Sequence, residues 1–114
     1  MKFVCRLCLL LLLSLLTLES HGQVIISEFM ADNKNTLADE NQHYPDWVEV
    51  YNQSSATVNL LGWALTDDPT HQSKWTFPST NLLPKAFLVV FASGTNIAIP
   101  GRPLHADFSL KASG

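Results

Sequence analysis

Cysteine is scarce in this chain and confined to its first few residues. Only Cys5 and Cys8 occur, and both lie in the segment that we interpret below as a leader. The rest of the chain therefore has no disulfide available, and its stability must come from a packed core. Neither residue is placed for lipid attachment, because such a cysteine would follow an apolar run rather than begin it.

Long hydrophobic runs are also scarce. The one clear run, Leu7–Leu18, is shorter than the roughly 20 apolar residues that a membrane span requires. Two basic residues precede it, and small residues follow it up to Gly22. This order is typical of a secretory signal peptide. We expect residues 1–22 to be a signal peptide and residues 23–114 to be one domain that is secreted or held at the cell surface. An uncleaved anchor is the alternative, and membrane contact is expected only through the export signal.

Basic residues are few once the leader is set aside. Removing Lys2, Arg6 and Glu19 from the seven basic and ten acidic residues leaves five and nine, a net charge of −4. Proteins that bind a nucleic-acid backbone rely on clustered Lys and Arg. The sequence therefore predicts no nucleic-acid partner.

Motifs of catalysis and cofactor binding are missing as well. There is no Gly-x-Ser-x-Gly turn and no glycine-rich phosphate loop. His43, His71 and His105 stand about 30 residues apart, whereas zinc ligands are usually closely spaced. We expect these histidines on the surface, no cofactor, and no enzyme activity in this segment.

Glu28 and Glu49 differ from the other acids because each falls inside a predicted strand. Two carboxylates on neighbouring strands could act as an acid–base pair, as in glycosidases. The interpretation we favour is that each meets a backbone donor or a basic side chain at a sheet edge.

Short segments with β propensity make up most of the remaining chain, and turn residues separate them every 8–12 residues. No segment has a sustained helical period, apart from one helical turn expected near Thr36–Glu40. This spacing predicts an all-β, immunoglobulin-like antiparallel β-sandwich. Because the sequence stops on a turn signal, Ser113-Gly114, we expect the sandwich to lack its last strand or strands. The predicted strands are Val24–Phe29, Trp47–Tyr51, Thr57–Leu60, Trp63–Thr66, Lys74–Phe77, Ala86–Phe91 and His105–Leu110.

Alternation along these strands predicts which side chains reach the core. Trp63 shares a face with Leu65, and Trp75 shares one with Phe77, so we expect all four to be buried. In the second strand, Val48 and Val50 point one way and Trp47, Glu49 and Tyr51 the other. Trp47 and Tyr51 are therefore the candidates for an exposed aromatic platform that binds a ligand such as a polysaccharide.

Five acidic residues lie in loops or at turns and are candidates for a calcium site, because Ca²⁺ takes several oxygen ligands. No calcium-loop spacing is present, so we interpret them as solvated or turn-capping residues and expect no metal. The long loop Met30–Pro45 is where we would look for a binding function, since long loops in compact domains are often functional. The five acids are Asp39, Glu40, Asp46, Asp67 and Asp68.

Several stretches taken together resemble the lamin tail domain family, most closely its exported bacterial branch. They are VIISEFMADN, DWVEVYNQSSATVNLLGWALTDD, KWTFP, FLVVFASG and LHADFSLKASG. The resemblance covers nearly all of Val24–Gly114. The residues that carry it are Glu28, Trp47, Glu49, Asn52, Leu60, Gly62, Trp63, Leu65, Trp75, Phe77, Pro78 and the strand Phe87–Phe91.

The resemblance implies an immunoglobulin-like domain without a catalytic role. In nuclear lamins such a domain binds proteins and DNA, whereas in exported bacterial proteins it is an accessory module. We therefore expect a binding, adhesion or targeting module of a larger protein, with an unknown protein or polysaccharide as its ligand. One alternative is the N-terminal accessory segment of a secreted hydrolase or spore-coat kinase-like enzyme. Another is self-association through an exposed strand edge.

One turn departs from the family pattern. The family usually places a glycine-rich turn before the apolar strand, where this chain has Pro84-Lys85-Ala86. A residue with a Cβ there would raise the cost of any conformation with positive φ.

Overall fold

A computed structural model of the chain describes residues 23–71 and 74–110, and the signal-peptide prediction for residues 1–22 lies outside this part. The described residues contain no helix, so the helical turn expected near Thr36–Glu40 is wrong. This part of the chain therefore offers no helix long and apolar enough to cross a membrane. The strands are β1 (Val24–Met30), β2 (Asp46–Asn52), β3 (Val58–Asn59), β4 (Ala64–Leu65), β5 (Trp75–Thr76), β6 (Asn81–Leu82), β7 (Phe87–Ala92) and β8 (Leu104–His105).

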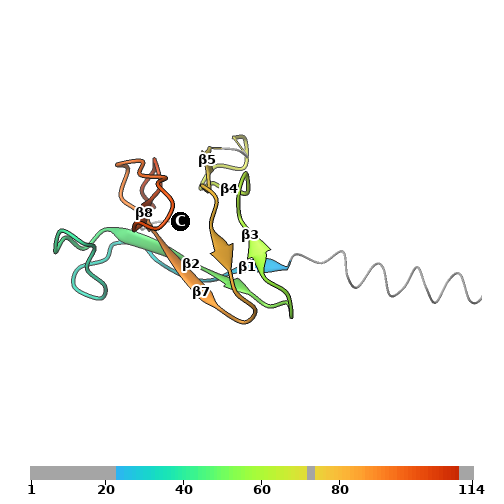
Figure 1. Cartoon of the computed structure of the whole chain (residues 1–114). Coiled ribbons are helices and arrows are strands. Elements are labelled where there is room, and N and C mark those ends of the chain that lie inside the picture. The colour runs from blue at the N-terminus through green and yellow to red at the C-terminus, as the bar shows by residue number, and fades with distance from the viewer. Residues whose placement is uncertain (1–22, 72–73, 111–114) are drawn as a thin grey trace, which may run out of the picture.

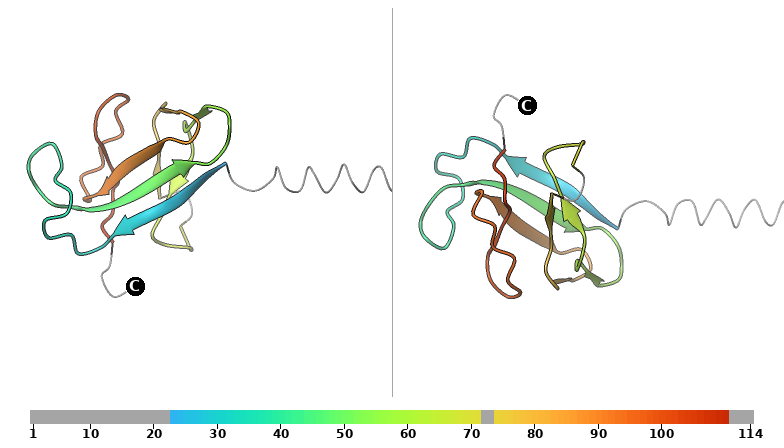
Figure 2. Two further views of the ribbon diagram at one scale, coloured as in Figure 1. Left: turned by 90° about the horizontal axis from the view of Figure 1, so that it is seen from below. Right: turned by 90° about the horizontal axis from the view of Figure 1, so that it is seen from above.

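The strands form one long sheet and two short ladders. The long sheet has the order β1-β2-β7-β8, and the ladders pair β3 with β6 and β4 with β5. In Figure 1, β3, β4 and β5 stand on one side of the long sheet, and Figure 2 shows β1, β2 and β7 running side by side. This two-layer, all-β arrangement confirms the predicted immunoglobulin-like sandwich. β8 is an exception to the antiparallel pattern, because it pairs with β7 in parallel.

The core lies between the long sheet and the two ladders. Val48, Val50 and Val90 line the inner face of the long sheet, in agreement with the predicted alternation in β2. Leu65, Trp75 and Phe77 meet them from the ladder side. The complete buried cluster is Val48, Val50, Val58, Leu60, Leu65, Trp75, Phe77, Leu82, Val90, Ala92, Leu104, Ala106 and Phe108.

Trp75 and Phe77 are buried together, as predicted. Their rings meet edge to face with centroids 5.0 Å apart. Trp75 Nε1 donates a hydrogen bond of 3.1 Å to Asn96 Oδ1, so this buried ring has a partner for its polar atom.

The burial expected for Trp63 is wrong, and Trp47, a candidate for an exposed platform, is buried. Trp63 is 38% exposed, because its backbone N–H closes a turn on Leu60 O and the alternation through β4 does not extend back to it. Trp47 is only 6% exposed, although it faces away from Val48. Its register neighbours Met30 and Phe91 flank it on both sides, because β2 lies between β1 and β7.

Asn52 fixes the end of β2 from inside the fold. Its side chain is fully buried, and Nδ2 lies within hydrogen-bond distance of the carbonyl oxygens of Ala56, Leu82 and Leu83. Its Oδ1 accepts from the backbone N–H and the hydroxyl of Ser54. One amide therefore ties the turn after β2 to β6, a role that sequence reasoning did not assign.

The turn that departs from the family pattern does adopt positive φ. Lys85 has φ of 60°, a conformation that costs a residue with a Cβ roughly 1–2 kcal/mol. Its backbone N–H donates to Asn52 O at 2.8 Å, and its ammonium group bonds to Gln53 O. These contacts offset the backbone strain at a position where glycine would carry none.

Candidate functional site

The loop between β1 and β2 is held in shape by Asn33, a buried polar residue. Asn33 Nδ2 donates to Leu37 O at 3.0 Å and to Pro45 O at 2.9 Å, and Oδ1 accepts from Thr36 N at 2.9 Å. Its backbone N–H donates to Asp46 Oδ1 at 3.1 Å. Side-chain bonds of this kind replace the missing ladder bonds of an irregular segment. The long loop therefore has a defined conformation.

Asp39 organises the tip of the same loop. Its Oδ1 accepts from the backbone N–H groups of Asn41 and His43, each at 2.9 Å. Burial alone would raise the pKa of Asp39, but these two donors favour the charged form and hold its pKa below the usual value. Asp39 is thus an anion that fixes the turn, and the turn presents the neighbouring Glu40.

Glu40, at the tip of the loop between β1 and β2, contacts His105 of β8. His105 Nε2 lies 2.9 Å and 3.0 Å from the two carboxylate oxygens of Glu40, and Nδ1 lies 2.8 Å from Ser93 Oγ. A hydrogen bond from the backbone N–H of Glu40 itself, and then the bond from His105, lower the pKa of Glu40. Because a carboxylate only accepts, Nε2 carries the proton in this contact.

The prediction that His105 lies on the surface is wrong, since the residue is 2% exposed. β8 adds to β7 in parallel and places His105 beside Phe91, and the two rings stack with centroids 5.2 Å apart. The backbone of His105 also pairs with Ile97 in both directions. The imidazole is therefore locked between the sheet and the loop.

These side chains line a hollow of 470 Å³ that opens at the loop end of the sheet. We call it the polar hollow, and its lining is Asp39, Glu40, Asn41, His43, Tyr44, Pro45, Ser93, Thr95, Ile97 and His105. Ligand atoms of Asp39, Glu40 and His105 lie within 4.8 Å of one another.

Ser93, His105 and Glu40 are hydrogen-bonded in sequence. A hydroxyl, an imidazole and a carboxylate in this order are the nucleophile, the base and the orienting acid of a catalytic triad. In that chemistry the carboxylate is buried and the hydroxyl meets the substrate. Here Glu40 is the exposed member of the three and Ser93 is half-buried, so the side open to solvent is that of the carboxylate. The arrangement therefore differs from that of a catalytic triad in which member is exposed.

The structure separates the five acids named as calcium candidates. Asp46 accepts from the backbone of Asn33, Asp67 pairs with Lys74 at 3.0 Å, and Asp68 Oδ1 accepts from Thr70 N at 2.9 Å and from its hydroxyl at 2.6 Å. The bonds from Thr70 lower the pKa of Asp68. Asp39 and Glu40 alone join a histidine.

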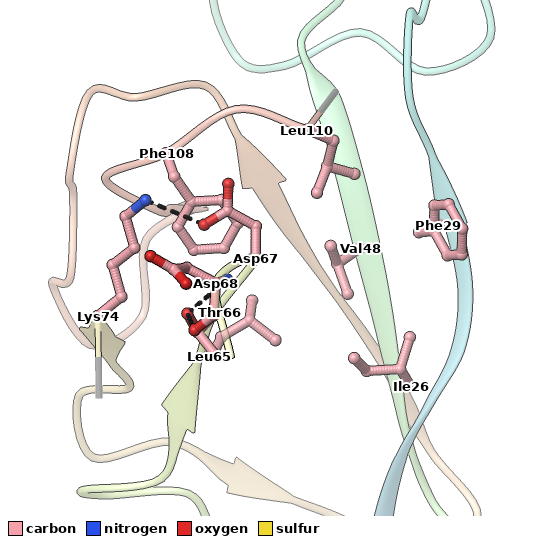
Figure 3. Close-up of a pocket in the computed structure, with 10 residues that line it drawn as sticks. All are labelled: Ile26, Phe29, Val48, Leu65, Thr66, Asp67, Asp68, Lys74, Phe108 and Leu110. Atoms are coloured by element: carbon pink, nitrogen blue, oxygen red, sulfur yellow. Dashed lines mark hydrogen bonds and ion pairs between the residues drawn. The ribbon is translucent and has the colours of Figure 1, made fainter. Parts of the chain in front are cut away.

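Asp67 and Asp68 border a second hollow, of 690 Å³, between β1 and the end of β4. We call it the apolar hollow. Figure 3 shows Ile26 and Phe29 projecting from β1 on one side, with Leu65 and Phe108 on the other. Its lining is Ile26, Phe29, Val48, Leu65, Thr66, Asp67, Asp68, Lys74, Phe108 and Leu110.

The outer face of the long sheet holds the remaining candidates. Tyr51 is half-buried and stacks on the exposed Phe87, with centroids 4.4 Å apart and planes at 27°. Trp47 is buried and offers no free ring face there. Glu49 accepts a bond of 2.9 Å from the Ser27 hydroxyl, a partner that differs from the backbone donor or basic side chain expected. The register places Glu28 opposite Glu49.

Sequence reasoning missed Ser93, His105 and Asn33 as members of the site. The first two meet because β7 and β8 are neighbours, which spacing along the chain does not reveal. A signal was available for Asn33, because an asparagine that begins a long loop often bonds to the backbone a few residues on.

Comparison with known proteins gives one match. The model of the family described as Lamin Tail Domain matches residues 17–113. No curated protein and no solved structure matches the chain. The match spans well over half of the sequence and agrees with the two-layer β fold. The chain belongs to the lamin tail domain family.

Proposed function

We propose that this chain is a non-catalytic binding, adhesion or targeting module that works outside the cell as part of a larger protein. Its ligand would be a protein or a polysaccharide, bound at the loop end of the long sheet. The observation that carries this proposal is the polar hollow, which is lined by a loop that Asn33, Asp39 and His105 hold in one shape without a ligand. Binding residues are commonly carried by loops that a rigid scaffold positions.

Site-specific photo-crosslinking tests the location of the binding surface. A photoreactive residue at Asn41 lies at the rim of the polar hollow, and one at Ser79 lies on an exposed turn elsewhere. Both versions of the full chain are displayed to intact cells of the producing organism and to purified cell-wall polysaccharide. We expect adducts from position 41 only. Equal labelling at both positions would contradict a specific surface, and labelling from Ser79 alone would place it elsewhere.

Export is supported by the sequence pattern of residues 1–22, with positive charges before a short apolar run. A tagged full-length chain expressed in the producing cell gives a direct test. We expect the protein in the medium or on the surface, with Gln23 as its first residue by mass spectrometry. An intact chain that begins at Met1 and stays inside the cell would contradict secretion.

The alternative role, as the accessory segment of a secreted hydrolase or kinase-like enzyme, uses the same surface. The chemistry would then reside in another domain, and the polar hollow would position that domain or its substrate. Crosslinks from Asn41 to a covalently linked neighbouring domain of the same polypeptide would favour this alternative over an external ligand.

A further inference from the structure

The polar hollow gathers two carboxylates and one imidazole around a single point. We propose that Asp39, Glu40 and His105 form a binding site for Zn²⁺. The three ligand atoms lie within 4.8 Å of one another, although they come from a loop and from a strand far along the chain. This site goes beyond the proposed binding role and does not depend on it.

The donor set selects among metals. Ca²⁺ and Mg²⁺ are bound by oxygen ligands, whereas imidazole nitrogen suits zinc and other first-row transition metals. Zinc sites commonly combine histidine with aspartate or glutamate. The acids considered from the sequence offer only oxygen ligands. His105 adds a nitrogen ligand, which makes the ligand set a mixed one.

The distances allow an ion to enter if the ligand atoms rearrange, because the three atoms lie within 4.8 Å of one another. Zinc binds nitrogen and carboxylate oxygen at about 2.0–2.2 Å, so tetrahedral ligand atoms lie about 3.4 Å apart. His105 Nε2 and the Glu40 oxygens are now 2.9–3.0 Å apart, bonded to each other. Glu40 sits on the exposed side of the hollow and needs to retreat by about half an ångström.

The surroundings of His105 fit a metal ligand. A ligating histidine usually donates its other ring N–H to a neighbouring group, which fixes the ring orientation. Ser93 Oγ lies 2.8 Å from Nδ1 and 2.7 Å from Thr95 Oγ1. With zinc on Nε2, Nδ1–H donates to Ser93, and the Ser93 hydroxyl donates to Thr95. The hydroxyl pair thus satisfies the imidazole whether Nε2 holds a proton or a metal.

Asp39 is also prepared for the role. The hydrogen bonds that it accepts within the described residues end at Oδ1, which leaves Oδ2 for an ion. Three protein ligands complete all but one position of a tetrahedron, and the opening of the hollow leaves that position accessible. His43 lines the same hollow and is exposed.

Isothermal titration calorimetry with ZnCl₂ tests the site. The full chain is used with Cys5→Ser and Cys8→Ser, so that leader thiols do not bind the ion. We expect one Zn²⁺ per chain, and an at least tenfold loss of affinity in Glu40→Gln and in His105→Gln. Asp67→Asn and His71→Gln remove an acid and a histidine elsewhere and should bind as the parent does.

Glu40→Gln keeps the proposal falsifiable if His105→Gln fails to fold, because Glu40 lies on the exposed loop. Zinc K-edge absorption of the complex should show nitrogen and oxygen ligands that include one imidazole. Absence of binding by the parent would overturn the proposal. So would equal affinity in Glu40→Gln, or displacement of zinc by equimolar Ca²⁺.

Discussion

The polar hollow and the apolar hollow open beside the same long sheet, yet they are built in opposite ways. In the polar hollow, the buried side chains of Asp39 and His105 have polar atoms bonded to groups of the loop. In the apolar hollow, Ile26 and Phe29 are 55% and 64% exposed, with nothing packed over them among the described residues. The first is a shaped surface, and the second is a part of the inner face without cover.

The register pair Phe29 and Val48 shows where the cover of the inner face ends. Phe29 stands opposite Val48 on adjacent strands, so both point to the inner face. Val48 is 4% exposed and belongs to the core, whereas Phe29 is mostly open to water. Within residues 23–71 and 74–110, the second layer therefore covers β2 and stops before β1. Apolar side chains alone do not define a binding surface, because their packing depends on whether a second layer covers them.

The largest predicted effect tests the covered wall of the apolar hollow. Leu65→Ala should lower the free energy of unfolding by about 2–4 kcal/mol, because it leaves a cavity against the core. Urea denaturation measures the change. Leu61→Ala, at an exposed neighbour, should cost less than about 0.5 kcal/mol. Equal costs for the two variants would show that the wall is not packed as described.

The next effect tests the loop that lines the polar hollow. Asn33→Ala leaves two carbonyl oxygens and one N–H group of the loop without partners and should cost about 2 kcal/mol. Hydrogen exchange of the loop amides should accelerate as well. Asn35→Ala, at an exposed position of the same loop, is the matched control. A neutral Asn33→Ala would mean that the loop is shaped by something other than this side chain.

A smaller effect is expected at β1. Phe29→Ser should change the free energy of unfolding by less than about 1 kcal/mol, because the ring is already largely hydrated. If chains associate through this edge, sedimentation at increasing concentration should show fewer dimers in the variant. A cost as large as that of Leu65→Ala would instead show that the ring is covered in solution.

The smallest effect concerns pH. A carboxyl with a lowered folded-state pKa stabilises the fold above its unfolded value, here 3.8 for Asp39, and loses that contribution as the pH falls through the folded value. Asp39→Asn keeps an oxygen for Asn41 N and His43 N but does not titrate. Urea denaturation at pH 7 and pH 3 should show a smaller loss of stability in the variant, by less than about 1 kcal/mol. An unchanged pH dependence would contradict this.

The long strands were predictable, because β1 begins with β-branched residues, β2 alternates and β7 is an almost unbroken apolar run. Where their bounds differ from the expected ones, the difference is one residue at an end. The two-residue strand β6 was missed, since so short a pair has no period of its own. Alternation also assigned Trp47 to the correct face but could not show that its neighbours bury it. The site was predictable only in part: the sequence indicated the loop and Asp39 and Glu40, whereas His105 joins them through a pairing that depends on the whole fold.

The bond between Glu40 and His105 joins residues 65 positions apart. A ribosome makes the loop early and β8 late, so a partly synthesised chain carries the acids without their histidine. A chain truncated after β7 would keep every residue of the loop and still lack this contact. Binding of an ion between Glu40 and His105, as proposed, would therefore require that β8 has been made and has docked beside β7.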